Sequence, residues 1–411
     1  MTRLFRPVGL LMLVVPLTLI AVLAFLVSDE LKTSAQQASY LAHLGKDIGF
    51  PLRAGPAPSV RYPNSGPYDR RLGYSQLPLF LDRLRTRGYT VTEQAVPSAT
   101  MNALVNYGLN APYLEKDQAG LQVFDASNHL LYYQRTPERV YTSFDAIPPA
   151  LVSSLLYVEN RMLLDPGQPK RNPAVEWGRF ALAIWDRTVH IADPDHESPG
   201  GSTLATQIEK YRHSPEGRTE SAKEKIRQMA SASVRAYLNG EDTTAVRHQL
   251  VVHYLNTVPL GARTGFGEIH GIGDGLWVWY GRDFAQVNAL LADPGSAPLE
   301  ARALAYKEAL SLLISQRRPS YYLEHLDDLE ELTDAHLRVL AGAGIIPASL
   351  RDAALAQSLK QQAQHVKAPP APVERKGTNA VRVNLAAMLG VPRMYDLDRL
   401  DLTIGSTLDA S

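Results

Sequence analysis

The most informative stretch of this chain is Gly-Gly-Ser-Thr-Leu-Ala-Thr-Gln-Ile-Glu-Lys, residues 200–210. A glycine pair followed by Ser-Thr is typical of a flexible loop that enters a helix. A helix beginning near Ser202 aligns Thr203, Gln207 and Lys210 on one face, beside the free N–H groups that favour phosphate. The apolar residues with the same spacing are expected to pack inward: Leu204, Ile208 and Tyr211. The alternative is an ordinary capped helix with a solvated polar face.

The N-terminal residues predict a membrane anchor. Arg3 and Arg6 precede an uncharged run from Val8 to Val27, and acidic residues follow at 29 and 30. The run is long enough to cross a bilayer as a helix, and the charge order places the N-terminus in the cytoplasm and the rest of the chain outside. A cleaved signal peptide is the rival interpretation, but no clear small-x-small cleavage site follows the run. We therefore expect an uncleaved anchor over residues 1–30.

Composition excludes several classes of function. The 411 residues include no cysteine, which rules out disulfides and thiol chemistry. The formal net charge is +0, and no basic tract is interleaved with aromatic residues. The chain is therefore not expected to bind nucleic acid. Its length allows two or three structural units.

Residues before about 135 are mixed in pattern and predict a juxtamembrane stalk or a small α/β module over 31–135. Proline and glycine make 50–67 a loop or spacer. The regular elements expected here are a helix at 77–87, a strand at 89–92, and a hairpin with strands at 120–125 and 130–134.

From Pro148 onward the spacing of apolar residues is helical, which predicts a mainly α domain over 136–360. Beyond it, prolines at 369–372 mark a linker, so that 361–411 is expected to hold a linker and the start of a possible further domain, with a strand at 400–409. The helices expected in the domain are 148–159, 175–185, 221–238, 245–255, 307–314 and 333–341.

Several short motifs occur in a fixed order along this helical region. Their order and separation resemble those of the family 51 peptidoglycan glycosyltransferases, over about 140–345. The segments that carry the resemblance are 148–160 (PPALVSSLLYVEN), 200–210, 225–228 (KIRQ), 254–261 (YLNTVPLG), 279–282 (WYGR) and 318–321 (RPSY).

The resemblance implies a lysozyme-like, largely helical fold and a reaction at the outer face of the bacterial inner membrane, facing the periplasm. The family polymerises lipid II into glycan strands and releases undecaprenyl diphosphate, with Mg or Mn on the diphosphate. Its members occur alone or joined to a transpeptidase in class A penicillin-binding proteins, so a transpeptidase or other cell-wall synthesis proteins are the implied partners. Residues 403–409 resemble the segment that leads into a transpeptidase, but the chain has no Ser-x-x-Lys motif.

Glycosyl transfer needs a base for the attacking hydroxyl and positive charge for the departing diphosphate. Glu159 occupies the position of the family's catalytic Glu and is the expected base. By the same resemblance, Asn256 orders the turn behind the site or caps a helix. The residues expected to contact the diphosphate or sugar oxygens are Ser202, Thr203, Gln207, Lys210, Lys225 and Arg227.

The chain departs from the family's pattern at two motifs. After Glu159 the family has Asp, an aromatic residue and His, where this chain has Asn160, Leu163 and Pro166. In the third motif the second catalytic carboxylate is replaced by Gln228, and an amide neither binds a cation well nor shares a proton as a carboxylate does. Glu224 lies one helical turn earlier and is the expected substitute.

These departures leave two alternatives to an active polymerase. The first is a catalytically impaired member that binds glycan or lipid II as a scaffold, in which no carboxylate lies within about 5 Å of Gln228, the reach of a strong charge effect. The second is a lysozyme-like hydrolase, which requires a cleft lined by carboxylates with Lys210 turned away.

Overall fold

The computed structural model describes residues 5–63, 66–177, 202–293, 295, 297–362 and 372–408. The glycine pair at 200–201 and most of the helix expected at 175–185 lie outside these residues. The helices are α1 (Phe5–Thr33), α2 (Ala35–Gly45), α3 (Pro67–Arg71), α4 (Leu77–Arg85), α5 (Ala99–Asn106), α6 (Pro149–Glu159), α8 (Leu204–His213), α9 (Ala222–Ala236), α10 (Thr244–Thr257), α11 (Gly271–Tyr280), α12 (Phe284–Ala292), α13 (Leu299–Ser315), α14 (Pro319–Glu324), α15 (Leu326–Gly342), α16 (Ala348–Leu355), α17 (Pro372–Leu389) and α18 (Met394–Leu397). The strands are β1 (Leu52–Ala54), β2 (Glu93–Ala95), β3 (Leu121–Phe124), β4 (Leu130–Tyr133), β5 (Pro259–Arg263), β6 (Gly267–His270) and β7 (Leu402–Gly405).

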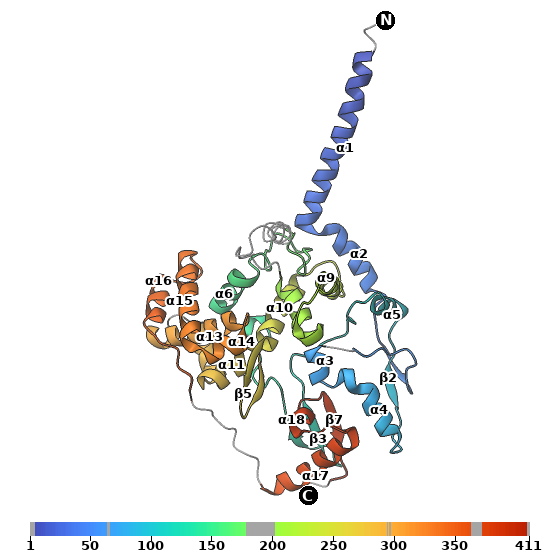
Figure 1. Cartoon of the computed structure of the whole chain (residues 1–411), viewed down its shortest axis with the longest axis vertical. Coiled ribbons are helices and arrows are strands. Elements are labelled where there is room, and N and C mark those ends of the chain that lie inside the picture. The colour runs from blue at the N-terminus through green and yellow to red at the C-terminus, as the bar shows by residue number, and fades with distance from the viewer. Residues whose placement is uncertain are drawn as a thin grey trace.

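The expected membrane anchor falls in α1, which projects away from the body of the molecule (Figure 1). Among the described residues, however, no helix combines the length and hydropathy that a membrane span requires. The structure therefore does not support the predicted anchor.

The mainly helical domain forms around α13, which is buried along most of its length (Figure 1). Apolar residues cover all sides of this helix, as expected for a helix that other helices surround. Its polar groups find internal partners: the hydroxyls of Tyr306 and Ser154 lie 2.6 Å apart, and Lys307 pairs with Asp334 at 2.8 Å. The largest hydrophobic cluster of the chain joins α13 to α6, α8, α10, α11 and α15.

The N-terminal and C-terminal segments share a second, smaller core. Strand β3 pairs antiparallel with β4, as the hairpin prediction required, and parallel with β7 on its other side. Side chains from α4, β3 and α17 meet there, including Phe80, Val123 and Leu385. Residues 372–408 thus pack against the module that precedes the helical domain, although they are far from it in sequence (Figure 1).

One strand prediction needs correction, and two strand regions were not predicted: β1, which lies in the segment 50–67 expected to be a loop or spacer, and the β5–β6 hairpin. The strand expected at 89–92 is wrong, because the strand is β2 at 93–95, which pairs with β1. The composition of residues 89–92 is typical of a strand, which led to the prediction. Residues 93–95 form the strand instead, because they are the ones that pair with the distant β1. The β5–β6 hairpin inside the helical domain was not predicted, and its glycines at 261, 265 and 267 have positive φ, as its tight turn requires.

Candidate active site

Glu159 is the last residue of α6, which Pro149 opens at its first turn. The helix ends there because Asn160 leaves the helical conformation, with φ −158°. The Asn160 side-chain oxygen accepts the backbone N–H of Leu204 at 3.3 Å, at the start of α8. Asn160, which departs from the family's pattern, therefore joins the end of one site helix to the beginning of the other.

The Glu159 carboxylate is buried, with 9% of the residue exposed, and two amides donate to it. Gln207 Nε2 donates to one oxygen at 2.7 Å, and Gln316 Nε2 donates to the other at 3.0 Å. Gln207 also accepts a hydrogen bond of 3.4 Å from Tyr254 Oη. The carboxylate is thus oriented from α8 and from the end of α13, and Gln316 was not predicted from the sequence.

Helix α8 begins at Leu204, two residues after the start expected near Ser202, and its apolar residues pack inward as expected. Its N-cap is Thr203, whose hydroxyl accepts the N–H of Thr206, and the Thr206 hydroxyl accepts the N–H of Thr203 in return. Leu204 and Ile208 are buried in the main core. Thr203 also donates to the carbonyl of Ala174 at 3.3 Å, so its hydroxyl is occupied in shaping the helix end.

Two lysines lie near one another at the site, and Lys210 is the one that interacts with the carboxylate. Burial lowers the pKa of Lys210, and the charge of Glu159 opposes that shift, which places these two groups close together. Lys225 donates to Ser202 Oγ at 2.7 Å. Burial, together with repulsion from Lys210, lowers the pKa of Lys225 to about 8. Two ammonium groups that repel one another form a region of positive charge suited to a diphosphate.

In the third motif, residues 225–228, the Gln228 side chain is hydrogen-bonded to hydroxyl groups. Gln228 is 0% exposed, and its amide donates to Ser214 Oγ and Thr219 Oγ1, each at 2.9 Å. The Ser214 hydroxyl in turn donates to Glu224, and Glu224 forms an ion pair with Arg227. Glu224 therefore reaches the same hydroxyl as Gln228, as its spacing predicted, whereas Arg227 is engaged with Glu224.

Asn256 links separate elements at the end of α10. Its side-chain oxygen accepts the N–H of Tyr141 at 2.8 Å, and its amide donates to the Tyr141 carbonyl and to Asp117. These bonds agree with the predicted role in ordering the structure behind the site.

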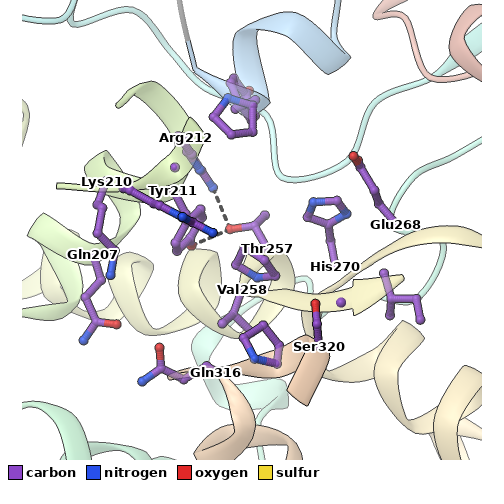
Figure 2. A pocket seen from close by; sticks show the side chains of 18 of the residues that line it. Gln207, Lys210, Tyr211, Arg212, Thr257, Val258, Glu268, His270, Gln316 and Ser320 are labelled. Carbon is purple, nitrogen blue, oxygen red and sulfur yellow. Dashed lines mark hydrogen bonds between the residues drawn. The ribbon is translucent and has the colours of Figure 1, made fainter. Parts of the chain in front are cut away.

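A cavity of about 680 Å³ opens beside Gln207 and Lys210 (Figure 2). Its walls come from α3, α8, the β5–β6 hairpin and the segment 316–321. Among the described residues, Arg218, Arg317 and Arg318 line this cavity without forming an ion pair with an acidic side chain. Its two acidic residues are already paired, Glu216 with Arg70 and Glu268 with Arg399, each at 3.1 Å.

Sequence reasoning missed these arginines. Arg318 is the first residue of the motif at 318–321 and Arg317 precedes it, and this position in the sequence was the only available signal. Arg71 and His270 also line the cavity and were not predicted, because they are brought together by contacts between segments that lie far apart in sequence.

A buried ionic cluster holds α8 against the N-terminal module. Arg212 contacts Glu115 at 2.6 Å and Asp117 at 2.8 Å. His213 lies between Asp69 and Glu115, and although burial lowers its pKa, these carboxylates raise it to about 10. His213 is therefore protonated at neutral pH, and the module is bound to the helix that carries Gln207 and Lys210.

The described residues of the site do not form a set of ligands for a divalent cation. In the described part of the chain, no group of three His, Cys, Asp or Glu side chains could hold a metal ion. The Lys210 ammonium lies near Glu159, and the position expected for a second carboxylate carries the Gln228 amide. We therefore assign no step of the reaction to a metal held by this site.

A buried carboxylate oriented by amides, two adjacent lysines and a cavity rich in unpaired arginines define a helical protein with a positively charged site suited to an anionic ligand. Comparison with family models agrees, because the model of the transglycosylase domain matches residues 127–343, just over half of the chain. The chain belongs to the transglycosylase family. A search of curated proteins found no match.

Proposed function

We propose that this protein is a peptidoglycan glycosyltransferase that polymerises lipid II into glycan strands with release of undecaprenyl diphosphate. The observation that carries the proposal is the buried Glu159 carboxylate beside Lys210, at the edge of a cavity whose unpaired side chains are basic. Family membership supports transfer of a glycosyl unit, and the lysines support a diphosphate leaving group.

In the proposed reaction, a sugar hydroxyl attacks the anomeric carbon that carries the diphosphate. The new C–O bond forms as the bond from that carbon to the diphosphate oxygen breaks, and the leaving group keeps the electron pair. Glu159 takes the proton of the hydroxyl, while Lys210 and Lys225 stabilise the charge that develops on the diphosphate. Gln207 and Gln316 fix the direction of the carboxylate, as their hydrogen bonds indicate.

The cavity favours transfer over hydrolysis. A lysozyme-like hydrolase needs a second carboxylate that flanks the substrate opposite the first. The acidic residues that line this cavity, Glu216 and Glu268, are both in ion pairs, and Lys210 lines the cavity instead of pointing away from it (Figure 2). Within the part of the chain that the structure describes, the requirement for hydrolysis stated above is therefore not met.

A binding scaffold is the second candidate, and one observation favours it. Gln228 is enclosed by the Ser214 and Thr219 hydroxyls, so an amide stands where the family's second carboxylate belongs. Glu224 reaches the same Ser214 hydroxyl, so a carboxylate does lie close to Gln228, contrary to the condition stated above for a scaffold. Its ion pair with Arg227, however, occupies that carboxylate. In this candidate function the protein binds lipid II or glycan and positions other proteins of cell-wall synthesis.

The proposal places the protein at the outer face of the bacterial inner membrane, where a lipid-linked substrate is held. Exposed apolar residues near the end of α1, such as Leu23 and Phe25, support contact with lipid. A divalent cation in this reaction would arrive with the diphosphate of the substrate, since the site offers ammoniums in place of carboxylates. A transpeptidase remains the proposed type of partner.

Glycan-strand synthesis from labelled lipid II tests the proposal. The native chain should form polymer, and Glu159→Gln should reduce the rate at least about 100-fold, the usual contribution of a general base. Glu300→Gln is the matched control, because it removes an exposed carboxylate at the start of α13 and should leave the rate unchanged. Polymer formation that survives Glu159→Gln would refute the assigned base.

Gln228→Glu separates the enzyme from the scaffold. If the native chain forms no polymer but binds lipid II, and Gln228→Glu forms polymer, the protein is a transferase disabled at one position and the scaffold function is correct. If the native chain forms polymer, the amide at Gln228 is compatible with catalysis. Each variant is compared at equal folded concentration.

A further inference from the structure

One end of the cavity is built from parts of the chain that lie far apart in sequence. Arg71 ends the short helix α3 of the N-terminal module, and His270 ends strand β6 of the helical domain. Arg71 Nη1 lies 2.5 Å from His270 Nε2, and both residues line the cavity. The C-terminal segment supports this wall, because Arg399 donates to the Glu268 carbonyl at 2.8 Å.

The contact fixes the protonation state of His270. Arginine has only donors, so Nε2 of His270 must accept and the ring proton must reside on Nδ1. Burial, followed by the charges of Arg71 and Arg399, holds the pKa of His270 well below its usual range, so the ring is neutral. His270 is 8% exposed, and among the described residues its Nδ1–H has no hydrogen-bond partner.

At this end of the cavity, the positive charge of Arg71 is not balanced by a paired carboxylate among the described residues. Burial and the nearby Arg399 lower the pKa of Arg71 to about 10, which reflects two guanidiniums close to one another. In the described structure Arg71 forms no ion pair, and Glu268, the adjacent carboxylate, is paired with Arg399. A buried N–H donor, and a half-buried cation without a counter-charge, are costly unless an acceptor satisfies them.

We propose that Arg71 and His270 form an oxyanion subsite, which binds a carboxylate or phosphate group of the ligand that also occupies the cavity at Lys210. The guanidinium fork of Arg71 offers paired donors to such a group, and His270, which accepts from Arg71 through Nε2, carries an unused Nδ1–H. The inference rests on the proposed function for the identity of that ligand. The recognition of a planar or tetrahedral oxyanion, by contrast, is inferred from the geometry of Arg71 and His270 alone.

The subsite makes the N-terminal module part of the binding site. Helix α3 is joined to α8 through the ionic cluster of Asp69 with His213, so Arg71 is held at a fixed place relative to Lys210. A ligand with anionic groups at two separated positions would contact both ends of the cavity. The module then acts in substrate selection in addition to supporting the fold.

Direct binding to the full chain tests the subsite without requiring catalysis. Calorimetry measures the affinities of two probes, inorganic pyrophosphate and N-acetyl-alanyl-alanine, whose free carboxylate represents a peptide terminus. Arg71→Gln should reduce the affinity for at least one probe about tenfold or more, because charged hydrogen bonds to the probe are lost. Arg351→Gln, an equal change of charge in α16 outside the cavity, should leave both affinities unchanged.

The two probes identify the source of the oxyanion. Weakening of the peptide alone assigns the subsite to a carboxylate, and weakening of pyrophosphate assigns it to phosphate. Arg71→Lys keeps the charge but removes the fork, and it serves if Arg71→Gln does not fold. Nuclear magnetic resonance of ¹⁵N-labelled histidine should show His270 as the Nδ1–H tautomer, with a signal that moves on binding. Unchanged affinity of both probes in folded Arg71 variants, or no shift of that signal, would overturn the proposal.

Discussion

Gln228→Glu is expected to destabilise the fold, although it restores the residue type of the family's motif. The Ser214 hydroxyl has one proton, which it donates to Glu224, and its lone pair accepts the Gln228 amide at 2.9 Å. A carboxylate at 228 would place an oxygen against that lone pair, beside a second carboxylate and without solvent. The loss of two buried donor bonds is expected to cost about 2 kcal/mol.

Thermal unfolding measures this cost. At about 2–4 °C per kcal/mol for a domain of this size, the melting temperature should fall by about 4–8 °C at pH 7.5. Burial raises the pKa of the introduced carboxyl above its value in the unfolded chain, near 4.3. The penalty is therefore complete above the folded pKa, and the difference from the native chain should shrink as the pH falls toward 5.

The charge-swapped double variant is the control. Gln228→Glu combined with Glu224→Gln restores one amide and one carboxylate around Ser214, and it should recover most of the lost stability. A single variant as stable as the native chain at pH 7.5, or a double variant no more stable than the single one, would refute the hydrogen-bond assignment.

Two further predictions follow from the charged groups. Because the pKa of Lys225 is about 8, pyrophosphate should bind more weakly as the pH rises from 7 to 9. Lys225→Arg should remove most of that pH dependence, because arginine stays protonated over this range. The same pH dependence of affinity in the variant would contradict the assignment to Lys225. Arg212→Met removes the buried cation that joins Glu115 and Asp117, although His213 and Arg235 still face Glu115, and it should lower the free energy of unfolding by about 3 kcal/mol. Arg351→Met, which breaks a surface pair, should cost at most about 1 kcal/mol in the same denaturant experiment, and equal losses would show that the buried pairs have no special weight.

Much of the helical domain is predictable because its helices carry local signals. The proline at the start of α6, the cap of α9 at Ser221 and the hairpin at 121–133 each lie within a few residues of the element they define. The strand β2 escaped prediction because its partner β1 lies about forty residues away in the chain, and strand position depends on pairing.

The sequence by itself determined the family, the helix that carries Glu159 and the alignment of Gln207 with Lys210, because motif order and helical spacing are local properties. It also showed that an amide replaces a carboxylate at Gln228. Only the tertiary structure decided that Gln316 orients Glu159 and that Arg71 meets His270. These contacts join residues that lie between about 150 and 200 positions apart in the chain. The distances between such residues are set by how whole helices and strands pack, which no local sequence pattern encodes.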